Sequence, residues 1–471
     1  MTKFYITSAI PYVNAKPHIG LALEYVQTDA IARFHRLIGD EVLYLCGSDE
    51  NALKNVQAAN AAGVPIQKFV DQNSKLFIDL AKKLNVQQDI WQRGSDEEKH
   101  YKSSQKLWEL CSKDIYKKKY KGLYCVGCEQ FYEREELNEN GECFEHPGKK
   151  LDEVEEENYF FKLSAYKEKL LELITSDILK VVPDFRKNEV LGWLSGEVPD
   201  LSISRSNERA KNWGVPVPGD DTQRIYVWFD ALNIYQSGIG FGWDEKTYQK
   251  WWPADLHVIG KGISRFHTVY WPAFLLSAGL ELPKAVLIHG YYTVNGQKMS
   301  KTLGNVYDPI PLLQKYGADP LRYYLLAKTP LFDDGDFSEE KFKEAYNSDL
   351  ANGLGNLVAR VAKLAERTEF EIRNLKFEIY PEINTFLRDF RVDLAIGFLW
   401  EKVKECDQKI DSAQPWKLEK KELQEFLDKI IPEIQSLAYN LQPFLPETAA
   451  KIKNQFTGKI KSDKSLFPRI E

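Results

Sequence analysis

The fold is decided by Phe4-Tyr5-Ile6-Thr7-Ser8-Ala9-Ile10, a run that leads into Pro17-His18-Ile19-Gly20. The apolar run predicts a strand, and the helical spacing of Val26, Ala30 and Phe34 predicts a helix directly after it. A strand that turns into a helix presents free backbone N–H groups and a positive dipole end, which attract phosphate. Glycine at the turn lets the backbone approach a ligand. This turn is therefore expected to form one half of a nucleotide site.

The other half is expected about 280 residues further along, in Lys298-Met299-Ser300-Lys301. This motif follows a predicted glycine turn at Asn295-Gly296, so its lysines stand on a loop as mobile positive charges that can meet a triphosphate. Taken alone, His18 would be read as a cap or core residue, and the lysines as solvated surface residues. The two motifs together favour a shared nucleotide site, whose expected members are His18, Gly20, Lys298, Ser300 and Lys301.

The first and third quarters of the chain alternate strands with helices. After the strand Glu41–Cys46 the chain continues through Gly47-Ser48-Asp49, and a helix is expected over about 52–62. Such alternation predicts an α/β fold with a Rossmann-type, doubly wound parallel sheet, whose ligands lie at the carboxyl ends of the strands. The expected catalytic halves are residues 1–115 and 223–337.

Two further units are expected. Residues 116–222 break the alternation and form a predicted insertion, after which strands return at Ile225–Asp230, Leu256–Gly260 and Ala285–Gly290. From 338 to 471 the strands disappear, and the spacing of apolar residues indicates a helical bundle. Helical patterns run through about 350–364, 384–412 and 420–455.

The insertion contains a cysteine cluster with metal-ligand spacing. Cys125-Val126-Gly127-Cys128 and Cys143-Phe144-Glu145-His146 form a CxxC…CxxH pair. Two-residue spacers let two side chains converge on one ion, and four such ligands make a closed, structural zinc site. Free buried cysteines are the alternative. We expect one structural Zn²⁺ held by Cys125, Cys128, Cys143 and His146.

A second group of residues suggests a small-molecule pocket. Asp49, at a strand end, could cap the next helix or hold a ligand ammonium group. Five further residues are equally compatible with packing in the protein core and with lining an apolar pocket that has one or two polar groups. They are Trp228, Ala231, Tyr235, Ile263 and His267.

The composition is that of a globular protein, with 43% hydrophobic and 28% charged residues. The net charge of −6 argues against non-specific coating of nucleic acid but allows a local RNA-binding face. The basic run Lys117-Lys118-Lys119 is typical of a solvated loop or helix end. No stretch approaches the ~18 apolar residues of a membrane span. The strand pattern begins too early for a signal peptide, so we expect a cytoplasmic protein without a membrane partner.

Six motifs, in this order, resemble the methionyl-tRNA synthetases, a family of class I aminoacyl-tRNA ligases. They are Ala9-Ile10-Pro11-Tyr12-Val13-Asn14, Pro17-His18-Ile19-Gly20, the CxxC…CxxH knuckle, Asp200-Leu201-Ser202-Ile203-Ser204-Arg205, Tyr226-Val227-Trp228-Phe229-Asp230-Ala231 and Lys298-Met299-Ser300-Lys301-Thr302-Leu303-Gly304-Asn305.

The resemblance implies a methionine–tRNA ligase that joins L-methionine to ATP, with Mg²⁺ on the nucleotide, and passes the methionyl group from the adenylate to tRNA(Met). It implies that His18 and the lysine loop hold the phosphates, that Asp49 binds the methionine ammonium group, and that Arg205 lies near the active site. The implied side-chain pocket is Ile10, Tyr12, Trp228, Ala231, Tyr235, Ile263 and His267. The helical bundle resembles an anticodon-binding domain. Because the chain ends at Glu471, before any appended dimerisation module, a monomer is expected.

Four positions depart from the family pattern. Leu21 and Asn51 stand where members have histidine, Gly262 replaces an aspartate near the ATP ribose, and Asp407 replaces an asparagine associated with anticodon reading. Losing one donor at position 21 would cost about 10²–10³-fold in rate. Leu21 and Gly262 favour one alternative, a weakened paralogue that only binds tRNA or methionine. A second alternative is another HIG-type nucleotidyltransferase, which would need neither zinc knuckle nor bundle.

Overall fold

The computed structural model describes residues 2–127, 130–132, 134–144, 148–299, 305–368, 370 and 377–470, with the side chains of all of these except Gln130, Glu135 and Lys298. Three members of the predicted sites, Ser300, Lys301 and the side chain of Lys298, lie outside this description. So do Cys128 and His146.

Six parallel strands form the central sheet, in the order β3-β2-β1-β12-β13-β7. Their bounds are Lys3–Ser8 (β1), Glu41–Ser48 (β2), Ile90–Arg93 (β3), Lys180–Val182 (β7), Leu256–Gly260 (β12) and Ala285–His289 (β13). The strand order reverses between β1 and β12, which makes the carboxyl ends of these two strands the switch point where such folds bind ligands. The predicted doubly wound parallel sheet is confirmed.

Alternation along the strands divides the interior into two cores. On β1, Phe4 and Ile6 belong to one buried cluster, whereas Tyr5 between them belongs to the other. Both faces of the sheet are therefore covered, as a parallel sheet requires. The helices on the two sides are α1 (Ile19–Leu37), α2 (Leu53–Ala61), α3 (Ile66–Lys83), α4 (Lys102–Leu110), α8 (Val227–Leu232), α9 (Ile234–Ser237), α10 (Glu245–Trp251), α11 (Trp271–Ala278) and the π-helical turns η1 (Glu97–Tyr101) and η6 (Phe266–Tyr270).

The predicted strand at Ile225–Asp230 is wrong. Strand β11 ends at Ile225, and the six residues of α8 that follow are all buried. An apolar run that is buried on every side has the same pattern in a short helix as in a strand, so periodicity could not separate them.

The segment predicted as an insertion holds several small elements around a long two-stranded ribbon. They are β4 (Ile115–Cys125), β5 (Gln130–Tyr132), β6 (Asp152–Phe161), α5 (Lys167–Thr175), α6 (Asp184–Ser195), β8 (Leu201–Ser202), β9 (Ser204–Ser206), α7 (Asn207–Ala210), β10 (Pro216–Val217) and β11 (Asp220–Ile225). Within the same range, β7 pairs with β13 and so completes the edge of the central sheet. The boundaries 116 and 222 stay predictions.

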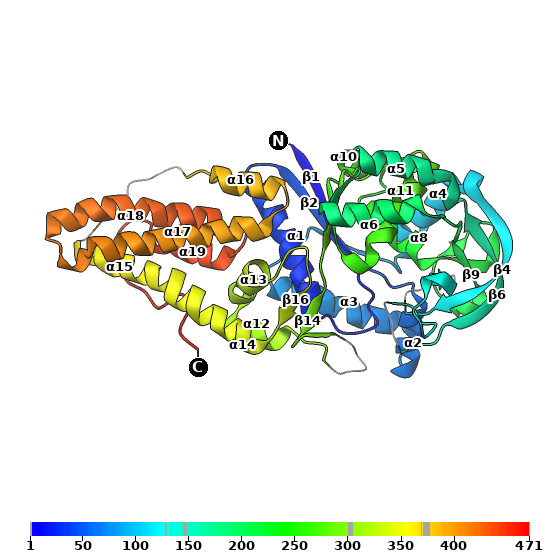
Figure 1. The fold of residues 1–471 in the computed structure, drawn as a ribbon, viewed down its shortest axis with the longest axis horizontal. Coiled ribbons are helices and arrows are strands. Elements are labelled where there is room, and N and C mark those ends of the chain that lie inside the picture. The colour runs from blue at the N-terminus through cyan, green and yellow to red at the C-terminus, as the bar shows by residue number, and fades with distance from the viewer. Residues whose placement is uncertain are drawn as a thin grey trace.

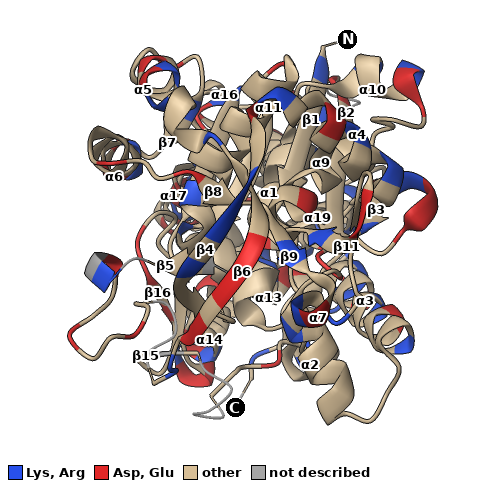
Figure 2. Ribbon diagram, turned by 90° about the vertical axis from the view of Figure 1, so that its right-hand side faces the viewer, with Lys and Arg blue, Asp and Glu red and all other residues tan. Residues whose placement is uncertain are grey.

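The basic run Lys117–Lys119 lies in a strand, so its interpretation as a loop or helix end is wrong. In the ribbon, Lys119 faces Glu157 and Lys121 faces Glu155 in the antiparallel register of β4 with β6. Figure 2 shows one basic and one acidic strand side by side. Opposite charges placed across a strand pair stabilise the pairing, so the ribbon neutralises its own charge.

The carboxyl-terminal part is a helical bundle at the opposite end of the long axis from the ribbon (Figure 1). Its elements are η7 (Tyr346–Gly355), α15 (Asn356–Thr368), α16 (Pro381–Arg388), α17 (Val392–Ala413), η8 (Pro415–Lys417), α18 (Lys420–Leu441) and α19 (Pro446–Gln455). The expected apolar face over 350–364 is buried, but each of the two longer predicted helices is divided in two. Between sheet and bundle lie β14 (Tyr292–Val294), β15 (Gln297–Lys298), α12 (Ile310–Tyr316), α13 (Ala318–Ala327), β16 (Gly335–Phe337) and α14 (Glu339–Ala345).

A buried ion pair joins the sheet domain to this bundle. Asp29 on α1 lies 2.7 Å from Arg322 on α13, and both side chains are fully buried. Arg322 also donates to the carbonyl oxygens of Phe444 and Pro443, at the end of α18, at 2.7 and 3.0 Å. Asp29 further accepts from Arg33 at 2.7 Å. The Arg322 guanidinium thus connects α13 with α1 and with the segment that follows α18.

In the described part of the chain, we find no helix with both the length and the apolar character that crossing a bilayer requires.

We predict that Arg322→Ala lowers the free energy of unfolding by about 3–5 kcal/mol, because it leaves the Asp29 carboxylate buried beside unpaired carbonyl groups. Denaturant unfolding measures this change. As a control, Lys102→Ala removes an exposed ion pair with Glu98 and should cost less than about 1 kcal/mol. Similar losses in the two variants would contradict the importance given to the buried pair.

Candidate functional site

His18 caps the helix that starts at the switch point. Its backbone is extended, with φ −128° and ψ 173°, and its Nδ1 accepts a hydrogen bond from the Gly20 N–H at 3.1 Å. A neutral imidazole whose Nδ1 accepts carries its proton on Nε2. His18 can therefore donate from Nε2, which suits a phosphate oxygen.

The N–H groups of this helix end are not free, contrary to the sequence prediction. The N–H of Ile19 donates to the carbonyl oxygen of Tyr307 at 3.0 Å, and that of Leu21 to the carbonyl oxygen of His18 at 3.0 Å. The Gly20 N–H is taken by the histidine ring. Attraction for phosphate at this end therefore comes from the helix dipole and from His18 rather than from unoccupied backbone donors.

The second motif lies against the first, as the sequence predicts. A Cβ built on Gly20 would lie 3.1 Å from the His18 ring and 3.3 Å from Cε of Met299. The position is therefore crowded, and a larger side chain at residue 20 would push its two neighbours back by a few tenths of an ångström. The hairpin β14–β15 delivers Met299, and its turn has φ of 52° at Asn295 and 75° at Gly296. Positive φ at both positions is the type I′ geometry that Asn-Gly favours.

Asp49 follows β2 at the same edge of the sheet. It forms a parallel bridge with Tyr12, which follows β1, and its side chain is 2% exposed. The cap of α2 is Ala52, so the alternative that Asp49 caps this helix is wrong. The amide of Asn55 donates to the backbone carbonyl of Asp49 at 2.9 Å and fixes the loop that carries it.

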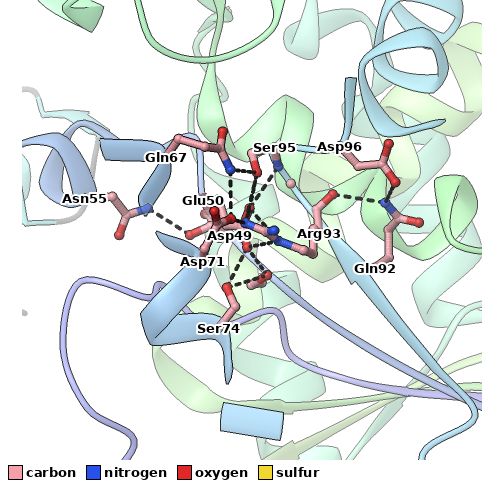
Figure 3. Close-up of polar contacts among 12 residues, drawn as sticks. Asp49, Glu50, Asn55, Gln67, Asp71, Ser74, Gln92, Arg93, Ser95 and Asp96 are labelled. Atoms are coloured by element: carbon pink, nitrogen blue, oxygen red, sulfur yellow. Dashed lines mark hydrogen bonds and ion pairs between the residues drawn. The ribbon is translucent and has the colours of Figure 1, made fainter. Parts of the chain in front are cut away.

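A buried carboxylate next to Asp49 connects this loop to neighbouring elements through several polar contacts (Figure 3). Glu50 is fully buried and forms an ion pair with Arg93 at 2.9 Å, while Ser48 and Ser74 donate to its Oε1 at 2.6 Å each. Ser95 donates to the other carboxylate oxygen. A buried charge is tolerated when every lone pair is occupied, as it is here.

Asn51, one of the family departures, links this loop to α8. Its side-chain amide donates to the Gly94 carbonyl oxygen at 2.7 Å and to Oδ2 of Asp230 at 2.6 Å. The other oxygen of Asp230 faces Nε2 of His100 at 2.7 Å and accepts from Ser104 at 2.8 Å. Asparagine at position 51 is thus part of a buried polar network that holds α8 in place.

Part of the predicted pocket lies around Trp228. Its ring stacks on Phe266 with centroids 3.7 Å apart, and Tyr12 meets it edge-on at 6.0 Å. Ile10, Tyr12 and Ile263 lie partly buried against the same cluster that contains Trp228 and Tyr235. Phe266 is not among the predicted pocket residues, although its place between Ile263 and His267 was a signal. Ala231 is also buried, one turn beyond Trp228.

The imidazole of His267, at the polar end of this pocket, has a defined tautomer. His267 Nδ1 faces the Ile263 carbonyl oxygen at 2.9 Å and must donate, so its Nε2 accepts from the Tyr235 hydroxyl at 2.8 Å. Burial lowers the pKa of His267 to about 4, which keeps the ring neutral near pH 7. Burial and the neighbouring His267 also hold the pKa of His257 well below its usual range.

A buried pair of side chains, which no sequence pattern indicates, connects the elements that carry the two motifs. Glu24 on α1 accepts from the Ala9 N–H at 2.8 Å and lies 3.0 Å from Nε2 of His289, at the end of β13. His289 leads into the β14–β15 hairpin. Because the partners are 265 residues apart, only the fold could place them together.

Leu21 and Gly262, two further positions that depart from the family pattern, fit their surroundings in the structure. Leu21 is 9% exposed and belongs to the core beneath α1. At Gly262, an added Cβ would lie 1.9 Å from the Tyr291 hydroxyl, so the space of the family aspartate is filled by tyrosine.

Two of the four predicted zinc ligands are described, and they lie together. The sulfur atoms of Cys125 and Cys143 are 3.3 Å apart, and both residues are buried. This separation is too long for a disulfide, whose bond is about 2.05 Å. It is within about half an ångström of the ~3.8 Å that two thiolates reach when Zn–S is about 2.3 Å in tetrahedral geometry. Within the described ranges, three or more potential ligands do not gather elsewhere.

Comparison with known proteins gives consistent matches. Residues 4–362 match the family model described as tRNA synthetases class I (M). The chain is 40% identical to a methionine–tRNA ligase of Thermotoga maritima, over 96% of this chain and 74% of the relative, and 40% identical to that of Brucella suis, over 99% and 94%. Its structure is similar to Mycobacterium tuberculosis methionyl-tRNA synthetase in complex with methionyl-adenylate, with a TM-score of 0.91 and 36% identity over the full length of both chains.

We predict that the protein loses stability as the pH falls from about 6.5 towards 4, because the unfolded chain then protonates His267 while the folded pocket keeps it neutral. At pH 5 this one group should lower the free energy of unfolding by about 2 kcal/mol relative to pH 7.5. Denaturant unfolding of the wild type and of His267→Gln at both pH values measures the difference. An equally large fall in the variant would contradict the assignment to His267.

Proposed function

The chain belongs to the class I tRNA synthetases of the methionine type, and on that premise we propose that it is a methionine–tRNA ligase. The enzyme activates methionine with ATP to methionyl-adenylate, releases diphosphate, and transfers the methionyl group to tRNA, releasing AMP. The observation that carries this function is the meeting of both phosphate motifs, through Gly20 and Met299, beside the Asp49 loop at the switch point of the sheet.

Activation requires the methionine carboxylate to attack the α-phosphorus of ATP in line with the departing diphosphate. Such a step needs little covalent chemistry from the protein, so the rate depends on positioning and on stabilising the charge of the phosphates. We propose that His18 donates from Nε2 to a phosphate oxygen. Lys298 and Lys301 then supply the mobile positive charges, and Mg²⁺ accompanies the nucleotide.

We propose that the methionine site lies between the ends of β1 and β2 and helix α8. The Asp49 carboxylate binds the ammonium group, and the apolar walls from Trp228 and its neighbours take the thioether chain. Neutral His267 supports this assignment, because a charged ring would be unfavourable next to an apolar side chain. Its protonated Nε2 could also no longer accept the hydrogen bond from the Tyr235 hydroxyl. The network that fixes Glu50 and Asn51 makes the carboxylate rigid before methionine arrives.

One structural Zn²⁺ is proposed for Cys125, Cys128, Cys143 and His146. The donor set supports it, because two buried thiols already lie within reach of one ion. When bound, the metal would hold the loop at the end of β4 and would do no chemistry.

The remaining assignments are proposals of the same kind. The helical bundle would bind the anticodon part of tRNA(Met). We propose a cytoplasmic location, which suits an enzyme of ATP and tRNA. A monomer stays a prediction.

The alternative of a binding paralogue has one observation in its favour. Leu21 packs in the core and offers no hydrogen bond where family members carry a histidine. His18, Asp49 and the lysine motif persist, so we expect turnover that is slow but dependent on methionine. The match to the methionine-type family argues against a different nucleotidyltransferase.

We predict methionine-dependent ATP–pyrophosphate exchange by the purified protein. Asp49→Asn should raise the KM for methionine about 10–150-fold, the cost of removing a charge-assisted hydrogen bond. The control Asp71→Asn alters the other carboxylate that forms an ion pair with Arg93 and should leave the KM for methionine nearly unchanged.

We predict that Leu21→His, which restores the family residue, raises the rate of exchange. Absent exchange in the wild type, with recovery in Leu21→His, would favour the paralogue.

We predict one zinc per chain by elemental analysis of the purified protein, and none in the Cys125→Ser/Cys128→Ser double variant. The control Cys406→Ser removes a buried thiol in the bundle and should keep the metal. Unchanged stoichiometry in the double variant would rule out the knuckle as the zinc site.

A further inference from the structure

Helices α8 and α9 together present two faces to different parts of the protein. The backbone stays helical through Asn233, which joins them, with φ −72° and ψ −9°. Three residues of the predicted methionine pocket recur with the spacing i, i+3 and i+7 and so share one face. A polar set with the same spacing begins two residues later, on the other side of the helical path, because two residues turn a helix by about 200°. The pocket set is Trp228, Ala231 and Tyr235, and the polar set is Asp230, Asn233 and Ser237.

A buried histidine holds the polar face from outside. In η1, His100 lies 2.7 Å from Oγ of Ser237 through its Nδ1, and 2.7 Å from Oδ1 of Asp230 through its Nε2. Beside it, Asn233 donates to Oγ of Ser103 at 2.9 Å. Because all five side chains are buried, these contacts fix both helices and, with them, the face that lines the pocket.

Asn51 connects this polar face to the loop that carries Asp49. Its Nδ2 donates to Oδ2 of Asp230 at 2.6 Å and to the carbonyl oxygen of Gly94 at 2.7 Å. The N–H of Gly94 donates in turn to the carbonyl oxygen of Ser48 at 2.9 Å. A Cβ at Gly94 would lie 2.9 Å from that oxygen, so the end of β3 touches the loop without room for a side chain. The Asn51 amide therefore joins α8, β3 and the loop in one network.

The Asp230 carboxylate depends on the Asn51 amide. Asp230 is 2% exposed, and its Oδ1 accepts from Ser104 at 2.8 Å and faces His100. Its Oδ2 accepts from Asn51. A buried carboxylate oxygen that loses its donor is destabilised. An apolar side chain at position 51 should therefore drive the carboxylate, and α8 with it, away from the loop.

The loop and α8 carry the two ends of the proposed methionine site. The ammonium group is expected at Asp49, and the thioether chain against Trp228. Tyr12 connects these ends, because it forms a bridge with Asp49 and meets the Trp228 ring edge-on at 6.0 Å. The distance from the loop to α8 therefore determines how long an amino acid fits. One methylene too many or too few in such a pocket changes specificity about 10–200-fold.

We propose that Asn51 is a positioning residue that sets this distance and thereby limits the length of the amino acid that is activated. The inference rests on the proposed ligase function and names a determinant of its amino-acid specificity. Asn51 acts through Asp230 on the pocket wall of α8 and through Gly94 on the loop that carries the ammonium site.

The test compares Asn51→Leu with Asn440→Leu. Leucine has the same branching as asparagine but no hydrogen-bond donor. Asn440, on α18 in the helical bundle, is fully buried, and its Nδ2 also donates to a carbonyl oxygen, that of Ser436 at 2.9 Å. The control therefore removes a similar buried amide far from the predicted pocket.

ATP–pyrophosphate exchange is measured with L-methionine and with L-ethionine, which has one more methylene. Wild type should favour methionine in kcat/KM by about 10–200-fold. Asn51→Leu should lower this ratio about tenfold, because α8 moves away from the loop and makes room for the longer side chain. The KM for ATP should stay within about twofold of wild type. Asn440→Leu should leave the ratio unchanged, although it lowers stability.

An unchanged ratio in Asn51→Leu, or an equal fall in Asn440→Leu, would overturn the proposal. If Asn51→Leu fails to fold, Asn51→Ala replaces it, with the same expected result. The dissociation constants of the two amino acids, measured by calorimetry without ATP, give a ratio that does not depend on turnover. Absence of exchange in the wild type would contradict the ligase function, whereas the ratio of dissociation constants would still test the role of Asn51.

Discussion

The ion pair between Asp29 and Arg322 sets the position of helix α1 relative to the rest of the molecule. Asp29 also accepts a hydrogen bond from the Gln87 N–H. Arg322 donates to the carbonyl oxygens of Pro443 and Phe444, just after α18. The same helix begins at His18, so one helix carries the phosphate end of the site at its start and the contact with Arg322 near its middle. Since both charges are fully buried, the pair tolerates little displacement without a large electrostatic cost.

Buried contacts also hold the side chains of the candidate site in position. Each side chain that would touch substrate is oriented by a buried group behind it. The loop of Asp49 is held by the Glu50 cluster, Trp228 is held by Phe266, and the hairpin of the lysine motif starts beside the Glu24–His289 pair. A site whose contribution is positioning depends on such supports, because errors of an ångström would reduce the rate.

Much of this arrangement could be predicted from local patterns. Alternation of strands and helices indicates the parallel sheet, and the Asn295-Gly296 pair indicates the hairpin turn, since both are short-range properties of the backbone. The helix α8 could not be predicted, because its apolar residues are buried on all sides. Contacts such as Glu24 with His289 could not be predicted either, because they arise only when distant segments fold together. The hydrogen bond of the Ile19 N–H at the start of α1 likewise depends on a distant residue, because it uses the carbonyl oxygen of Tyr307.

The contact between Gly262 and Tyr291 couples two positions that are far apart in the sequence. A Cβ at position 262 would lie 1.9 Å from the tyrosine hydroxyl and 3.0 Å from the ring carbon that carries it. Any larger side chain at position 262 therefore requires the Tyr291 side chain to move aside. The effects of substitutions at the two positions are accordingly expected to be non-additive.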